Sequence, residues 1–203
     1  SLEIGTPDFK KHLTELSKDK RYVGIRMRER PGSDQFFENE TVWSDLQMLS
    51  DMDQSLDVLM FQYSLEDVGM VAKRLPKLKI LINHVAGADI KGKPADPNWV
   101  AAVQKVAKNS NVHCKISGMV TEASWDNWGS KNFDPYLDVV LNAFGPERLM
   151  IGSDWPVCRL AGEYQPVMQL TIDWLQIHAP EHLDDILGNN CLAFYTGAKG
   201  QGS

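Results

Sequence analysis

The feature that most constrains the fold is a regular alternation of short apolar segments with longer amphipathic ones. The apolar segments are Tyr22–Met27, Leu56–Gln62, Leu78–His84, Val112–Gly118 and Leu149–Ile151. Their bodies are apolar throughout, which is typical of parallel strands covered by helices on both faces. The segments between them carry apolar residues at helical spacing. The pattern predicts one helix followed by five strand–helix units in an α/β fold.

Helices are expected over residues 6–18, 41–53, 64–75, 96–107, 134–144 and 167–177, with short terminal helices over 181–195. Three of these segments open with a polar residue followed by proline: Thr6, Asp96 and Asp134. Such a residue caps a helix and proline fits its first turn, so all three are predicted N-caps.

Length and composition favour one domain over residues 1–203, because 43% of the 203 residues are hydrophobic. The net charge of −6 and the lack of a Lys/Arg block argue against nucleic acid or an anionic membrane as a partner. No apolar run approaches the ~20 residues that span a bilayer. The first residues lack signal-peptide features, and three widely spaced cysteines suit a reduced, cytoplasmic setting.

Polar side chains gather where the predicted strands end. In chain order they are Arg26, Gln62, His84, Lys115 with Ser117, and Asp154 followed by Trp155. The carboxyl ends of parallel strands meet at one edge of a sheet, where ligands bind in α/β proteins. The sequence therefore predicts a site at this edge, with a small molecule as its partner.

The residue types suit a reaction on an anionic substrate that carries a carbonyl group. Asp154 can act as a general base toward water, and His84 can donate to an oxyanion or bind a metal. Arg26 can clamp a carboxylate. Together with Arg26, the predicted substrate-binding residues are Gln62, Lys115, Ser117 and Trp155.

Each of these residues also has a structural interpretation. His84 can be a hydrogen-bonded structural histidine, and Lys115 a solvated strand end. Arg26 can pair with a structural acid, Gln62 can cap backbone groups, and Asp154 can cap its turn. The joint pattern favours function, because the polar groups sit at strand ends while strand bodies stay apolar.

A second candidate metal site is weaker. His178 and His182 are four residues apart, a spacing that binds zinc when both lie on one helix. Pro180 lies between them and is expected to break that helix. We therefore do not expect this pair to bind a metal.

Several motifs together resemble a known family. They are Gly24–Arg26, Ile82–His84, Cys114–Gly118, Gly145–Pro156 and Gly188–Asn190 ahead of a closing helix with Phe194 and Tyr195. They look like the amidohydrolase-2 type of the amidohydrolase superfamily, and most like its lactonase group, which includes sugar-lactone and 2-pyrone-4,6-dicarboxylate lactonases. The resemblance runs from about Thr6 to Tyr195, and Asn83 departs from the aspartate more usual before His84.

The resemblance implies a TIM-type (β/α)₈ barrel and a hydrolase that attacks a lactone or ester carbonyl with water. Asp154 would end the eighth strand as the base, His84 the sixth and Arg26 the fourth. A divalent metal such as zinc is a candidate cofactor, with His84 and Asp154 as its ligands. The substrate would be small and anionic or sugar-derived.

The family's first strand normally carries His-x-His, which does not occur in this sequence. A barrel needs eight strands, and five are predicted here, so the chain is expected to hold strands 4–8 with their helices. Such a piece exposes strand edges, which a second copy in a homo-oligomer could cover. One alternative is a truncated, catalytically incomplete barrel acting as a binding or assembly module. Another is an open doubly wound sheet, although no phosphate-binding glycine loop follows any strand.

Overall fold

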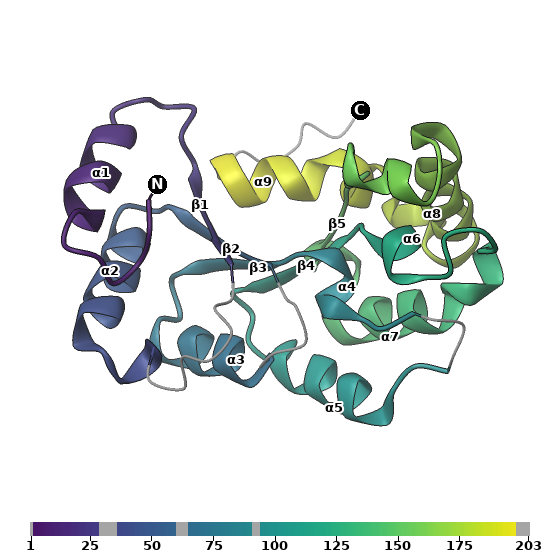
Figure 1. Ribbon diagram of the computed structural model, residues 1–203, viewed down its shortest axis with the longest axis horizontal. Coiled ribbons are helices and arrows are strands. Elements are labelled where there is room, and N and C mark those ends of the chain that lie inside the picture. Colours follow the sequence, from purple (N-terminus) through teal and green to yellow (C-terminus); the bar gives the residue numbers. More distant parts are fainter. Residues whose placement is uncertain (1, 29–35, 60–64, 91–93, 198–203) are drawn as a thin grey trace.

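The computed structural model describes residues 2–28, 36–59, 65–90 and 94–197, and the described part contains a parallel five-stranded sheet (Figure 1). Its strands are β1 (Gly24–Arg28), β2 (Ser55–Leu59), β3 (Lys79–Ile82), β4 (Val112–Ile116) and β5 (Leu149–Ile151). They pair in the order β1-β2-β3-β4-β5, so each strand neighbours the next along the chain. The predicted α/β fold with a parallel sheet is confirmed, while Gln62 lies outside the described residues.

Helices connect successive strands at the predicted places. The longer ones are α1 (Phe9–Leu16), α2 (Glu40–Asp51), α3 (Leu65–Arg74), α5 (Pro97–Val106), α7 (Asp134–Phe144), α8 (Tyr164–His178) and α9 (Asn190–Thr196). The shorter turns are α4 (His84–Gly87), α6 (Met119–Glu122), η1 (Phe36–Glu38), η2 (Ser130–Asn132), η3 (Pro146–Arg148), η4 (Val157–Leu160), η5 (Pro180–His182) and η6 (Asp185–Asn189). No helix in the described ranges is long and apolar enough to cross a membrane.

The predicted caps are confirmed at one helix of three. Asp96 caps α5, because its carboxylate accepts the Asn98 N–H at 2.7 Å. Thr6 does not cap α1, which begins three residues later; its hydroxyl instead donates to the Glu3 carbonyl. Asp134 is the first residue of α7 and not its cap. Pro180 does separate His178, the last residue of α8, from His182, as expected.

The two faces of the sheet are covered differently (Figure 1). Helices α3, α5 and α7 lie on one side, where they pack on apolar strand residues such as Leu56, Val58 and Ile80. Successive residues of a strand point to opposite faces, so Asp57 and Leu81 face the other way. That second face is covered by α9, which crosses the sheet (Figure 1).

Side chains of α9 dock on the second face by both apolar and polar contacts. Phe194 packs with Leu81 and Met150, and its ring centroid lies 4.8 Å from that of His113 on β4. The Tyr195 hydroxyl donates to the carboxylate of Asp57 on β2 at 2.8 Å. On this one face, α9 therefore contacts strands β2, β3, β4 and β5.

The His113 side chain makes the stability of this docking depend on pH. Burial, reinforced by the positive charge of Arg148, lowers the pKa of His113 from 6.5 to about 4. The unfolded chain takes up this proton below about pH 6.5, whereas the folded chain stays neutral until about pH 4. The contribution of His113 to stability is therefore complete above pH 6.5 and falls as the pH drops toward 4, by about 3 kcal/mol at most.

Urea unfolding at pH 7 and pH 4.5 measures this loss. We expect His113→Phe, which keeps an aromatic ring against Phe194, to lose less stability over this interval than the wild type. The control is His12→Gln, on an exposed face of α1, which should show the wild-type pH dependence. An unchanged slope in His113→Phe would remove His113 from this explanation.

Candidate active site

The structure brings His84 and Asp154 together at the C-terminal edge of the sheet. His84 lies two residues beyond β3, and Asp154 three residues beyond β5. The His84 Nε2 and the Asp154 Oδ1 are 3.7 Å apart, and the side chains are only 21% and 16% exposed. Two of the residues predicted from strand ends therefore form one half-buried pair, and the strand between them is β4.

The backbone at both residues is strained. His84, Val85 and Ala86 have φ of 54°, 46° and 52°, and Asp154 has φ of 57°. For residues with a Cβ this left-handed conformation costs about 1–2 kcal/mol each. Such strain persists where surrounding contacts hold it, and it is concentrated at functional sites.

Residues at the end of β4 fix the imidazole ring of His84. The Ser117 Oγ lies 3.0 Å from the His84 Nδ1, and Ser117 is buried. Gly118 leaves room for the ring, because a Cβ there would come within 2.6 Å of the Nδ1. Burial lowers the pKa of His84; the charge of Asp154 opposes this effect, and those of Arg26 and Lys115 add to it. Ser117, predicted to bind substrate, thus contacts the histidine itself.

Lys115 is held by protein groups. Its Nζ donates to the Asn83 Oδ1 at 2.9 Å and lies 3.7 Å from the Asp57 Oδ2. Burial lowers the pKa of Lys115, and the Asp57 carboxylate opposes the shift. A polar chain therefore runs from Tyr195 on α9 through Asp57 and Lys115 to Asn83, the neighbour of His84.

Three members of this chain were not predicted as site residues from the sequence: Asp57, Asn83 and Tyr195. The prediction of strand bodies that are apolar throughout is wrong at Asp57, and this carboxylate within Leu56–Gln62 was a local signal of a polar contact. Asn83 was noted only as a departure from the family pattern. Tyr195 gave none, since its partner Asp57 lies 138 residues away in the chain.

Two more of the predicted substrate-binding residues, Arg26 and Trp155, lie at the same edge of the sheet. Arg26 lies on β1 beside Asp57 of β2, and its charge acts on both His84 and Lys115. Trp155 directly follows Asp154 and is 62% exposed, so its indole is free to contact a ligand. Its backbone N–H donates to the Ser153 hydroxyl at 3.1 Å.

The residues that the structure describes do not complete a metal site on their own. His84 and Asp154 offer one nitrogen and one carboxylate ligand, whereas catalytic zinc is usually held by three protein ligands. Within the described ranges, no group of three or more His, Cys, Asp or Glu side chains is placed to hold a metal ion.

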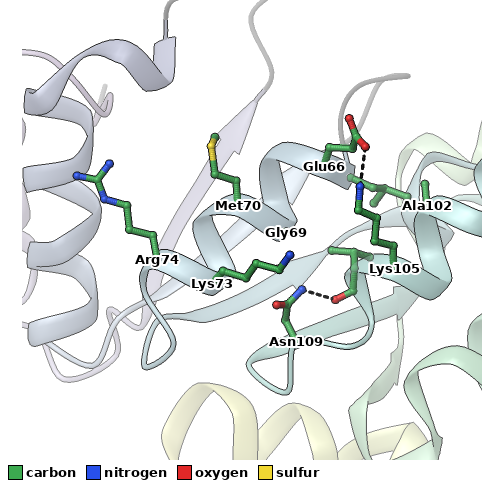
Figure 2. Close-up of a pocket in the computed structure, with 10 residues that line it drawn as sticks. Glu66, Gly69, Met70, Lys73, Arg74, Ala102, Lys105 and Asn109 are labelled. Carbon is green, nitrogen blue, oxygen red and sulfur yellow. Dashed lines mark hydrogen bonds and ion pairs between the residues drawn. The ribbon is translucent and has the colours of Figure 1, made fainter.

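A groove of about 490 Å³ lies elsewhere, between α3 and α5. Figure 2 shows its lining, in which Lys105 pairs with Glu66 at 2.8 Å and Lys73 lies alongside. Helices α3 and α5 lie on one side of the sheet (Figure 1), and the residues that line the groove do not include His84 or Asp154. The strand-end cluster is therefore the better candidate for chemistry.

Comparison with known proteins places this chain in a family. A model of the family described as amidohydrolase matches residues 5–196, nearly the whole chain. This chain belongs to the amidohydrolase family. Its parallel sheet is the one found in the TIM-barrel members of that family.

Relatives of this amidohydrolase include lactonases. An L-fucono-1,5-lactonase of Burkholderia ambifaria is 31% identical over 164 residues, which is 80% of this chain and 56% of that protein. An L-fucono-1,5-lactonase of Burkholderia multivorans is 37% identical over 138 residues, 61% of this chain and 45% of that protein. The chain thus spans about half the length of these relatives.

A solved structure supports the same placement. An amidohydrolase from Burkholderia multivorans with bound zinc superposes with a TM-score of 0.88 at 28% identity, over 95% of this chain and 70% of that one. A 2-pyrone-4,6-dicarboxylic acid hydrolase from Pseudomonas putida shares the fold, with a TM-score of 0.72 at 18% identity over 96% of this chain and 69% of that one.

Proposed function

We propose that this amidohydrolase hydrolyses a small lactone, with Asp154 as the general base. The observation that carries the proposal is the half-buried His84–Asp154 pair at the edge of the sheet where the strands end. The lactonase relatives support the reaction class, and a sugar-derived or anionic lactone is the proposed substrate.

In this proposal Asp154 removes a proton from water, and the resulting hydroxide attacks the lactone carbonyl carbon. Arg26 and His84 stabilise the negative charge that develops on the carbonyl oxygen. The intermediate then collapses, the ring C–O bond breaks, and the alkoxide takes the proton back from Asp154. The product is the open-chain hydroxy acid.

The remaining predicted residues have binding roles. Trp155 offers an exposed apolar face to a sugar ring, and Arg26 is suited to a substrate carboxylate. Lys115 and Ser117 contribute to binding by positioning their neighbours, because Lys115 contacts Asn83 and Ser117 contacts His84. Gln62 completes the proposed set.

We further propose that residues 1–203 form one domain that corresponds to strands 4–8 of the barrel. The number of strands described, and the shorter length than the matched relatives, support this assignment. A divalent metal such as zinc would need ligands beyond His84 and Asp154, and so would come with the rest of such a barrel. We also propose that copies of this chain self-associate and so cover the open edges of the sheet. The proposed location is cytoplasmic.

The test is the hydrolysis of a panel of lactones that includes L-fucono-1,5-lactone. The reaction is monitored by the acid that it releases into a weakly buffered solution. We expect turnover above that of the Asp154→Asn variant for at least one sugar lactone. A wild-type rate equal to the background on every lactone would contradict the proposal for this chain. It would favour a catalytically incomplete barrel that acts as a binding or assembly module.

A further inference from the structure

The turn that carries His84 has an unusual backbone. Four consecutive residues, His84 to Gly87, have positive φ, with values of 54°, 46°, 52° and 69°. Only the last is glycine, and Val85 is β-branched, the residue type least suited to this conformation. The turn is thus one left-handed helical turn made largely of residues that avoid it, so neighbouring groups must hold it in place.

One side chain outside the turn bonds directly to Ala86. The indole N–H of Trp99 donates to the Ala86 carbonyl at 3.1 Å, across a span of 13 residues. Ala86 is 97% buried, so this bond satisfies a carbonyl that is largely shielded from water.

The start of α5 places Trp99 where it can do this. Asp96 caps the helix, and Pro97 occupies its first position, so Trp99 falls in the first turn. The Trp99 ring also packs against Tyr136 of α7, with centroids 5.5 Å apart. Through Trp99, helix α5 therefore bonds to the His84–Gly87 turn, which directly follows β3.

The turn determines where the His84 ring lies. Leaving the strand in a left-handed turn places the imidazole beside Ser117 and Gly118, which directly follow β4. The same placement puts the Nε2 3.7 Å from Asp154, one strand further on. A turn of ordinary right-handed geometry would send the ring elsewhere.

We infer that Trp99 is a positioning residue for His84. Its hydrogen bond to the Ala86 carbonyl maintains the left-handed turn, and the turn holds the imidazole between Ser117 and Asp154. Trp99 lies outside the proposed catalytic cluster and acts through the backbone. The effect of Trp99 on catalysis rests on the proposed function. Its effect on the position of the His84 ring can be tested without measuring turnover.

The test is Trp99→Phe, which removes the indole N–H and keeps an aromatic ring against Tyr136. In the wild type, NMR should show contacts between the His84 ring and the Gly118 α-protons. Strong amide–Hα contacts within Val85 and Ala86 should mark their positive φ. We expect both signals to be lost or much reduced in Trp99→Phe. The matched control is Trp43→Phe, which loses an indole bond of the same kind to the Phe37 carbonyl and should keep both signals.

A rescue separates this role from simple packing. Glycine adopts positive φ freely, so adding Ala86→Gly to Trp99→Phe should restore the contacts between His84 and Gly118. Wild-type contacts in Trp99→Phe alone, or loss of contacts that the glycine does not restore, would overturn the inference. If Trp99→Phe does not fold, recovery of a folded double variant with these contacts supports the inference, and its failure to fold overturns it.

The rate of lactone hydrolysis is measured on the same proteins as a separate result. Lost contacts together with a fall in kcat support both the inference and the proposed function. Lost and rescued contacts in a chain without turnover support Trp99 as the residue that positions His84, and count only against the lactonase proposal.

Discussion

Asp154→Asn is expected to lower kcat for lactone hydrolysis by about 10²–10⁴, the usual contribution of a general base. Asparagine has nearly the same shape as aspartate but cannot take a proton from water. Because the side chain is only 16% exposed, bulk water does not replace it as a base within the half-buried pair with His84. The fall should appear in kcat more than in KM, since the lost interaction belongs to the transition state.

The control is Asp126→Asn, an exposed aspartate in the loop that follows α6. It should leave both kcat and KM at wild-type values. Urea unfolding of each variant checks that the fold is retained. Equal rates for the wild type and Asp154→Asn would show that another group activates the water.

The sequence predicted which residues reach the candidate site better than it predicted what each one contacts. His84 and Asp154 were expected at one edge because parallel strands put their carboxyl ends together, and the structure places them 3.7 Å apart. Lys115 was expected at the same edge as a substrate ligand. In the structure it contacts Asn83 and Asp57, and those contacts depend on strand pairing that local patterns do not reveal.

The left-handed turn could not have been predicted from local signals. Val85 and Ala86 are neither turn formers nor residues that tolerate positive φ. Their conformation is imposed from outside the turn, by the hydrogen bond that Trp99 donates to the Ala86 carbonyl. Local propensity does not predict this turn because tertiary contacts override it. Such failures are expected at functional or strained sites.

Arg148 of the Gly145–Pro156 motif is a second residue whose contacts, here structural ones, could not be predicted from the sequence. From the sequence, Arg148 is only the basic residue ahead of a short strand. In the structure its Nη1 lies within 3.1 Å of three carbonyl oxygens, those of Ala107, Asn109 and Val112. The carbonyls of Ala107 and Asn109 belong to the connection between α5 and β4, and Val112 is the first residue of β4. One guanidinium therefore joins the beginnings of two neighbouring strands.

Arg148→Met should therefore lower the free energy of unfolding by about 3–5 kcal/mol. Methionine preserves much of the side-chain stem but leaves three carbonyls without their charged donor, and Ala107 and Val112 are buried. A hydrogen bond to a charged group contributes about 1.5–3 kcal/mol, and several are lost together. Urea unfolding at pH 7 gives the change directly.

Arg159→Met is the matched control for this loss. Arg159 pairs with Glu163 at 3.6 Å, but its side chain is 60% exposed. Exposed ion pairs contribute about 0–1 kcal/mol, so this variant should unfold close to the wild-type midpoint. A loss below about 1 kcal/mol in Arg148→Met would mean that water satisfies the three carbonyls as well as the guanidinium does. The larger loss would show that Arg148 of the Gly145–Pro156 motif holds the beginnings of β4 and β5 together, while Asp154 of the same motif pairs with His84 beyond the other end of β5.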